Sequence, residues 1–187
     1  NFVPLIFDVN DRININKAIG VVKDRIGTNN LTALINNAGV AILGPLEFLE
    51  PIEFQKQMET NLIGVFNCVQ AFLPLLGTTN TKQKAQKGRI INISSALGGK
   101  IGYPFYGAYC SSKHALEGFS EALRRELKVH KIAVSIIAPG AIQTPIWNKA
   151  ETKSLACRFE GTVYQNAYQR VILDMKKLGE NGLKPEI

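Results

Sequence analysis

Gly88-Arg89-Ile90-Ile91-Asn92-Ile93-Ser94-Ser95 is an apolar, β-branched run that ends in two hydroxyl side chains. A short apolar run of this kind, bounded by polar residues, is typical of a strand buried in a parallel sheet. Two other stretches of the 187-residue chain follow the same pattern, Leu-Ile-Asn-Asn-Ala-Gly at residues 34–39 and Val-Ser-Ile-Ile-Ala-Pro-Gly at residues 134–140. Because helical patterns separate these runs, the sequence predicts an α/β fold with a parallel sheet.

Helical periodicity fills the joins between the strands. Asp11 is placed to cap a helix that reaches about Ile26, with apolar residues at steps of three and four. Further helices are expected at residues 52–76, 107–130 and 164–178, and strands at residues 2–9, 31–35, 88–95 and 132–137. Residues 41–49 and the glycine-rich residues 96–107 are expected to be loops. The short joins favour a sheet covered by helices on both faces, and no repeat or second domain is indicated.

Tyr109 and Lys113 stand four residues apart in the expected helix at residues 107–130, so they share one face of it. A free tyrosine has a pKa of about 10, and a nearby ammonium lowers that pKa toward the range of a general acid/base. In a parallel α/β sheet, ligands bind beyond the carboxyl ends of the strands, where Ser95 would join this pair. The alternative is a half-buried aromatic side chain beside a solvated lysine.

In their order and spacing these pieces resemble the short-chain dehydrogenases/reductases. The matching residues are Asn36-Asn37-Ala38-Gly39, Asn61, Ser95, Tyr109 with Lys113, and Pro139-Gly140 followed by Thr144. The resemblance runs from about Phe2 to about Trp147 and implies a Rossmann-like doubly wound parallel sheet. The spacing from Ser95 to Tyr109 is one residue longer than the family usually shows, which indicates an insertion in the loop at residues 96–107. Ser94, which should point to the opposite face of its strand, is the alternative to Ser95.

The resemblance implies hydride transfer between a nicotinamide cofactor and an alcohol or carbonyl substrate. It makes Tyr109 the general acid/base and gives Lys113 two tasks, lowering the pKa of Tyr109 and bonding the nicotinamide ribose. Ser95 is expected to donate to the substrate oxygen. Asn61 is expected to hold a water that links Lys113 to solvent, and its alternative is a satisfied buried amide.

The same resemblance implies cofactor contacts at three strand ends. Beyond Tyr109 and Lys113, the cofactor-binding residues that it implies are Asp8, Val9, Asn37, Ala38, Gly39, Pro139, Gly140, Ile142 and Thr144. Asp8 matches a residue that bonds the adenine amino group, and Thr144 matches one that bonds the nicotinamide carboxamide. Helix or turn caps are the alternatives for both. Asn36 is expected to brace neighbouring strands rather than to touch the cofactor.

The Gly-rich turn of the dinucleotide fingerprint, which should precede all these motifs, is absent from the sequence. Residues 2–9 instead resemble the family's third strand. We therefore expect a single partial Rossmann-like domain over residues 1–187, truncated at both ends, with a substrate loop at residues 146–161. In the strand order 3-2-1-4-5-6, the strand at residues 2–9 would lack its ladder partner. NAD and NADP cannot be distinguished, because the residue that decides between them ends the missing second strand.

The composition of the chain restricts the classes of molecule that it is expected to bind. The formal net charge is +7, but the basic residues lack aromatic interleaving, so we expect solvated surface and no nucleic-acid binding. No apolar run approaches the length of a membrane span. Three cysteines without metal-ligand or disulfide spacing favour a reduced, cytoplasmic setting and no metal site. We expect an alcohol or ketone substrate of hydrophobic character, and a homodimer or homotetramer when the protein is complete.

Two other functions stay open. One is a non-catalytic dinucleotide-binding regulator or scaffold on the same fold, against which the intact set of Ser95, Tyr109, Lys113 and Asn61 argues. The other is a sugar-nucleotide epimerase or dehydratase, a branch that shares Tyr-x-x-x-Lys but usually lacks Asn-Asn-Ala-Gly. Cofactor-dependent turnover of an alcohol would separate the enzyme from the scaffold.

Overall fold

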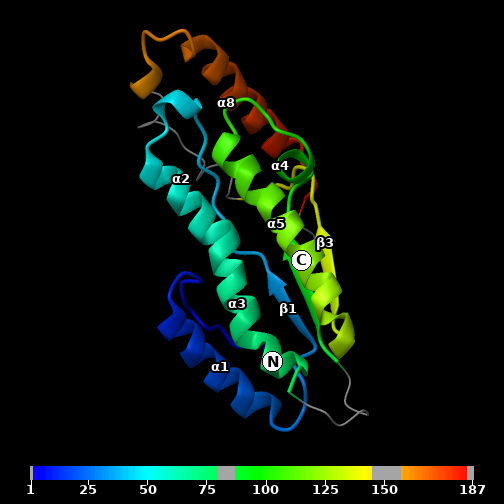
Figure 1. The fold of residues 1–187 in the computed structure, drawn as a ribbon. Helices are drawn as coiled ribbons and strands as arrows, with labels where there is room; N and C mark the ends of the chain where they lie inside the picture. The colour runs from blue at the N-terminus through cyan, green and yellow to red at the C-terminus, as the bar shows by residue number, and fades with distance from the viewer. Residues whose placement is uncertain (1, 80–86, 145–156, 185–187) are drawn as a thin grey trace.

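The computed structural model describes residues 2–79, 87–144 and 157–184, and its centre is a three-stranded parallel sheet (Figure 1). The strands are β1 (Ala33–Asn36), β2 (Arg89–Ile93) and β3 (Ala133–Ile137), in that spatial order. The register places Leu34 beside Ile90 and Ile90 beside Val134. These three runs are the ones that the apolar pattern predicts, so the α/β class and the parallel sheet are confirmed.

The expected helices form, with local departures from α-helical geometry. The α-helices are α1 (Arg12–Ile26), α2 (Pro51–Met58), α3 (Gly64–Phe72), α4 (Ala96–Lys100), α5 (Gly107–Glu126) and α8 (Gln165–Glu180). A π-helical turn, η2 (Glu59–Ile63), joins α2 to α3, and the 3-10 turns are η1 (Leu46–Phe48), η3 (Leu73–Leu76), η4 (Leu127–His130) and η5 (Cys157–Phe159). Asp11 caps α1 as predicted, accepting from the amides of Ile13 and Asn14. The prediction of a loop at residues 96–107 is wrong in its first part, because Ser95 caps the short helix α4 there.

Helices α3 and α5 lie side by side against one face of the sheet (Figure 1). Their apolar side chains bury Ile90 and Val134, and the main core forms at this contact. Helix α1 packs against α3 rather than against a strand, with Ile15 and Ala18 buried there. On the other face Ile35 and Ile137 are 59% and 49% exposed. The expectation of a sheet covered on both faces is therefore wrong for the described part of the chain.

Residues 2–9 were expected to form a strand, and this expectation is wrong. They form no ladder with β1, and a hollow of about 300 Å³, lined by Phe7 and Val9 on one side and by Leu34 on the other, separates the two segments. Backbone amides and carbonyls adopt strand geometry stably only when a neighbouring strand pairs with them. The segment is held instead by the packing of Phe7 and Val9 beside the cluster that joins α1 to α3.

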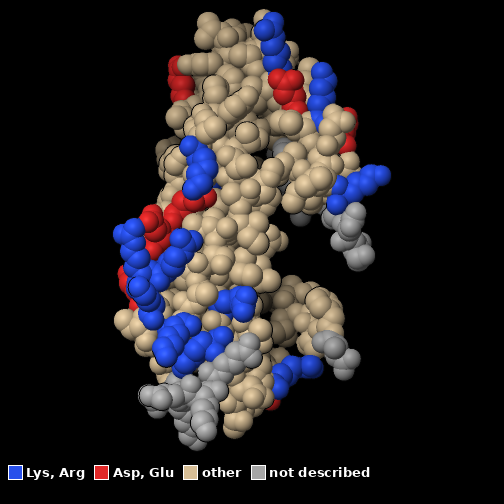
Figure 2. Space-filling model, turned by 90° about the vertical axis from the view of Figure 1, so that its right-hand side faces the viewer, with Lys and Arg blue, Asp and Glu red and all other residues tan. Residues whose placement is uncertain are grey.

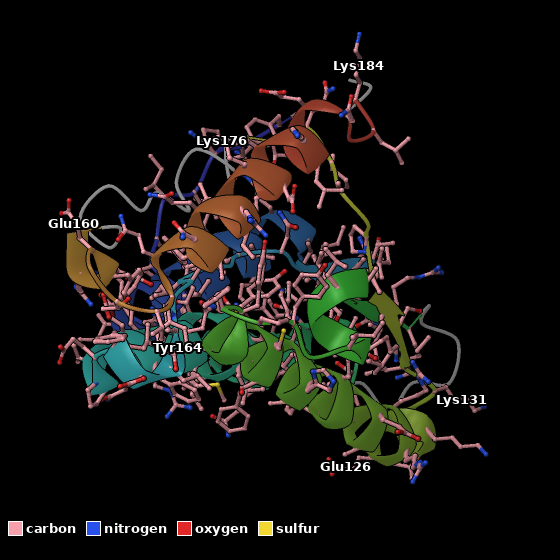
Figure 3. All side chains as sticks on the ribbon, turned by 90° about the horizontal axis from the view of Figure 1, so that it is seen from above. Glu126, Lys131, Glu160, Tyr164, Lys176 and Lys184 are labelled. Carbon is pink, nitrogen blue, oxygen red and sulfur yellow. The ribbon has the colours of Figure 1, made fainter. Side chains whose placement is uncertain are left out.

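Helix α8 lies beside the start of α5 and diverges from it, as the view from above shows (Figure 3). Met175 of α8 packs with Tyr106 and Cys110 in a separate apolar cluster. At the other end, Tyr164 stacks edge-on against Phe48 at 5.9 Å between ring centres. Residues 146–156 of the expected substrate loop, which include Trp147, lie outside the described residues. The described remainder of that loop, residues 157–161, starts with the turn η5.

Charged side chains of both signs occupy the surface. Figure 2 shows Lys and Arg side chains in a group at the lower left of the face in view and also at its upper right, with Asp and Glu side chains beside both. Within residues 2–79, 87–144 and 157–184, no helix combines the length and the apolar character needed to cross a membrane.

Candidate active site

A cavity of about 220 Å³ lies at the carboxyl ends of the three strands, where the sequence analysis expects polar groups to converge. Its lining includes most of the predicted site residues: Asn37, Gly39, Ser95, Tyr109, Lys113, Pro139, Gly140, Ile142 and Thr144. Three loops and one face of α5 therefore bring these residues together. Asp8, Val9, Ala38 and Asn61 do not line this cavity.

Ser95 reaches the cavity because it is the N-cap of α4. Its Oγ accepts a hydrogen bond from the Gly98 amide at 3.3 Å, and its side chain lies close enough to that of Tyr109 to lower the pKa of the phenol. Ser94, the alternative to Ser95, is 4% exposed, and its hydroxyl faces Glu117 of α5. The geometry favours Ser95 over Ser94 as the hydroxyl that meets Tyr109.

The tyrosine is largely enclosed. Burial raises the pKa of Tyr109, the nearby Ser95 hydroxyl lowers it, and the neighbouring Cys110 raises it, with a net increase. The expectation that Lys113 lowers the pKa of Tyr109 is therefore wrong for this structure. The physical reason is that removal of solvent disfavours the phenolate, while the ammonium lies 5.9 Å from the centre of the ring.

Lys113 is 7% exposed, and its Nζ donates to the carbonyl of Ile93 at 2.8 Å. This bond holds the ammonium at the end of β2, beside the cavity. Burial lowers the pKa of Lys113 to about 8, because the charged form loses solvation that one carbonyl does not replace.

Asn61 sits in the π-helical turn η2 and is 1% exposed. Its Oδ1 accepts from the amide of Val40 at 2.9 Å, and its Nδ2 donates to the Val40 carbonyl and to Ser112 Oγ, each at 3.0 Å. The side chain thus ties the loop after β1 to α5. Protein groups satisfy the hydrogen bonds of the Asn61 amide, as expected for the alternative of a satisfied buried amide. That Asn61 holds a water between Lys113 and solvent stays a prediction.

Ser112 is a residue of the site that the sequence analysis missed. It is fully buried, and its Oγ donates to the carbonyl of Tyr109 at 2.7 Å while accepting from Asn61. Its position within Tyr-Cys-Ser-Ser-Lys, three residues after the tyrosine, was the available signal. Ser112 therefore couples the turn of α5 that carries Tyr109 to the helix that carries Asn61.

A buried polar chain underlies the cavity. Asn36 Nδ2 donates to Asn92 Oδ1 at 2.8 Å, Asn92 Nδ2 donates to Ser120 Oγ at 2.7 Å, and Ser120 donates to the carbonyl of Leu116. The chain links β1 to β2 and β2 to α5. It confirms that Asn36 braces neighbouring strands.

Of the residues matched to the adenosine half of a dinucleotide, Asn37 and Gly39 line the cavity with Tyr109, whereas Asp8, Val9 and Ala38 do not. Val9 and Ala38 line the second hollow, beside β1, and Asn37 lines both hollows. Asp8 Oδ1 accepts from the Asn10 amide at 2.9 Å, which is a turn-capping contact of the kind named as its alternative. The two hollows share Asn37 in their linings, and the individual cofactor contacts remain predictions.

One wall of the cavity comes from a segment that no motif pointed to. Met175 of α8 lines it together with Leu97, Tyr106 and Ile142. The backbone at Ile142 is fixed by an isolated bridge between Ile142 and Leu183 and by the Gln143 amide, which donates to the Leu183 carbonyl at 2.9 Å. These lining side chains are largely apolar, whereas Ser95 and Lys113 bring polar groups to the same cavity.

Comparison with known proteins gives consistent results. A family model described as short chain dehydrogenase matches residues 1–155. The chain is 36% identical over 185 residues to the NADPH-dependent 3-dehydrocapnine reductase of Ornithobacterium rhinotracheale, which covers 99% of this chain and 64% of that protein. It is 36% identical over 181 residues to the 3-ketodihydrosphingosine reductase of Bacteroides thetaiotaomicron, which covers 97% and 63%.

Among solved structures, NADPH-bound carbonyl reductase from chicken fatty liver superposes with a TM-score of 0.71 at 28% identity, covering 81% of this chain and 62% of that one. The chain thus spans less than two thirds of the length of each of these three proteins.

Proposed function

Because this chain belongs to the short-chain dehydrogenase family, we propose that the complete protein is an NAD(P)-dependent oxidoreductase acting on an alcohol/carbonyl pair. The observation that carries the proposal is the meeting of Tyr109, Ser95 and Lys113 in one cavity at the carboxyl edge of the sheet. The intact group favours an enzyme over a regulator or scaffold that only binds the cofactor.

Tyr109 is the proton-transfer group in this proposal. In reduction its phenol gives a proton to the forming alkoxide oxygen, and in oxidation its phenolate takes the proton of the alcohol. Because the pKa of Tyr109 is raised, the phenol is protonated at neutral pH. The phenol is the form that gives its proton in carbonyl reduction.

Ser95 and Lys113 support this proton transfer from two sides. The Ser95 hydroxyl, which lies close to the Tyr109 side chain, is placed to share the substrate oxygen with it and to stabilise developing negative charge. The Lys113 ammonium, held by the Ile93 carbonyl, keeps donor hydrogens for a ribose hydroxyl of the cofactor. Asn61 keeps the loop at Val40 in place against α5.

The cofactor supplies or accepts the hydride when it is bound. In this proposal Pro139, Gly140, Ile142 and Thr144 hold its nicotinamide end, which their place in the lining of the cavity supports. Asn37, Ala38 and Gly39 take the middle of the dinucleotide, and Asp8 and Val9 take its adenine end. The hollow that Val9, Asn37 and Ala38 share supports this direction.

An alcohol or ketone of hydrophobic character fits the remaining wall. Leu97, Tyr106 and Met175 line the same cavity as the proton-transfer group, so an apolar substituent would be desolvated there. The match to a reductase named for the ketone 3-ketodihydrosphingosine is consistent with this substrate class.

A homodimer or homotetramer is proposed for the complete protein. Ile63 and Phe66, on the helical segment that follows Asn61, are 46% and 41% exposed, and Phe66 stacks edge-on with Phe119 of α5. Such an apolar surface across two adjacent helices favours self-association. Light scattering of the complete protein, with Phe66→Glu as the variant, would measure it.

Turnover by the complete protein tests the proposed activity. NADH or NADPH consumption with a series of apolar ketones should be measurable, and Tyr109→Phe should abolish it while cofactor binding, followed by nucleotide fluorescence, persists. Tyr103→Phe is the matched control, because Tyr103 is 50% exposed and lies outside the cavity lining. Retained activity in Tyr109→Phe would exclude the assigned role, and cofactor binding without any turnover would favour a scaffold.

A further inference from the structure

Glu117 continues the face of α5 that carries the proposed catalytic pair. Tyr109, Lys113 and Glu117 follow one another at intervals of four residues, so they line one side of the helix. The short helix α4 packs against this side. The first two residues have a role in the proposed reaction, and Glu117 lies one turn further from the cavity.

Helix α4 approaches α5 so closely that two glycines are needed. A Cβ at Gly98 would lie 2.5 Å from Cε1 of Tyr109. A Cβ at Gly99 would lie 2.5 Å from Ser94 Oγ and 2.7 Å from Glu117 Oε1. All three distances are well inside van der Waals contact, so Gly98 and Gly99 mark where α4 packs closely against α5.

The Glu117 carboxylate holds both ends of the α4 segment. Its Oε2 pairs with Lys100 Nζ at 2.6 Å, and its side chain is only 14% exposed. Burial raises the pKa of Glu117, but contacts from the Lys100 ammonium and the Ser94 hydroxyl outweigh burial and hold that pKa below its usual range. Ser94 directly precedes the cap residue, and Lys100 is the last residue of the helix.

The contact between Ser94 and Glu117 involves two buried polar atoms. Ser94 Oγ and Glu117 Oε1 are both buried, and neither meets strict hydrogen-bond geometry with any described atom. Buried polar atoms without partners are rare and costly. The two atoms lie on the same side of Gly99, and the Ser94 hydroxyl is, after the Lys100 ammonium, one of the groups that hold the pKa of Glu117 below its usual range.

We propose that Glu117 is a positioning residue for the reaction proposed above. By holding Ser94 and Lys100 it fixes α4, and thereby sets the Ser95 hydroxyl against Tyr109. A five-residue helix with two glycines is not stable by itself, so its orientation depends on such outside contacts. Glu117 does not line the cavity and touches neither substrate nor cofactor. The inference rests on the proposed oxidoreductase function.

The test compares Glu117→Ala, Glu117→Gln, Ser94→Ala and the double variant Ser94→Ala/Glu117→Ala in the complete protein. Glu117→Ala should lower kcat about tenfold to a hundredfold, the loss expected when a reacting group is displaced by about 1 Å. The KM values for substrate and cofactor should stay within about twofold, because ground-state binding is untouched. The double variant should be no worse than the more damaged single variant, because both changes remove one contact.

Glu121→Gln is the matched control, since Glu121 lies one turn further along α5 and pairs with Arg125 on an exposed surface. Its kcat should be that of the wild type. If Glu117→Ala does not fold, Glu117→Gln of nearly the same shape decides the matter: a lower kcat at unchanged KM supports the proposal. An unchanged kcat in a folded Glu117 variant overturns it, and so does an equal loss in kcat and in cofactor affinity.

Amide hydrogen exchange separates this proposal from the proposed function. The amides of Gly98 and Gly99 donate to Ser95 Oγ and to the Ser95 carbonyl, at 3.3 and 2.8 Å. In Glu117→Ala these amides should exchange faster while those of α1 are unchanged, whether or not the protein is active. Unchanged protection would overturn the anchoring role, whereas normal anchoring effects without any wild-type turnover would refute only the oxidoreductase function.

Discussion

Gly98 lies directly against the ring of Tyr109, with room for a hydrogen atom but not for a methyl group, since a Cβ would stand 2.5 and 2.8 Å from two ring carbons. The residue also donates its amide to Ser95 Oγ. One glycine thus touches both members of the proposed proton-transfer pair. The contact makes the ring orientation of Tyr109 sensitive to a single methyl group.

Gly98→Ala should lower both activity and stability. In an ordinary helix this change stabilises by up to about 1 kcal/mol, whereas forced overpacking costs about 1–3 kcal/mol, so a net loss reveals the clash. Urea unfolding and kcat of the complete protein measure the two effects. Gly102→Ala is the control, because nothing lies within 4 Å of its Cβ position. An unaltered kcat in Gly98→Ala would show that the ring moves aside without consequence.

Lys113 should make stability depend on pH. Its pKa falls from 10.5 in an exposed lysine to about 8 in the fold, so between these values the unfolded chain binds more protons than the folded one. The free energy of unfolding should therefore rise with pH above about 8, on this account, and the rise should end near the unfolded pKa.

The measurement is urea unfolding of the complete protein across this pH range. The quantity compared is the free energy of unfolding of the wild type minus that of Lys113→Met. The difference removes opposing contributions from tyrosines such as Tyr106, whose pKa is also raised by burial. A difference that is flat with pH would mean that Lys113 keeps its ordinary pKa.

The sequence predicts the three strands and the site's main groups because both depend on local patterns. The run at residues 88–95 signals a buried strand, and Ser95 follows that strand directly. Tyr109 and Lys113 share a face by helical spacing alone. Nothing local, however, says how burial and an ammonium compete at Tyr109, and in the structure burial dominates the pKa.

The features that sequence reasoning missed depend on contacts between distant segments. Residues 2–9 have strand-like composition, but a strand needs a neighbour to pair with, and the ladder partner is not found among the described residues. Met175 lines the cavity from helix α8, which lies far along the chain. Helical periodicity predicts that this helix forms, but it does not predict where the helix packs. Helix α4 was not predicted because its glycines usually indicate a loop. In the structure these glycines permit close packing of α4 against α5.

Asn92 should contribute strongly to stability. It is fully buried and joins Asn36 on one side to Ser120 on the other, so Asn92→Ala would leave both partners with unpaired polar groups. Each such group costs about 1–3 kcal/mol, and a loss of about 3 kcal/mol in the free energy of unfolding is expected. Chemical denaturation measures it, with the exposed Asn166→Ala as the control. A loss below about 0.5 kcal/mol, the level of ordinary surface changes, would contradict the role of this chain of bonds.

Met175 should affect substrate binding rather than the chemical step. Its side chain is 6% exposed, lines the cavity and packs with Tyr106. Met175→Ala removes apolar contact worth about 1–2 kcal/mol, so KM for an apolar ketone should rise about tenfold with little change in kcat. The cofactor KM should be unaltered, and Met175→Leu, which conserves volume, should restore most of the affinity. Because Met175→Ala also removes side-chain atoms from a packed cluster, the kinetics must be measured well below the unfolding temperature of this variant. Leu173→Ala, on the exposed side of α8, is the control. A fall in kcat at constant KM would place Met175 against the reacting atoms and remove it from the substrate wall.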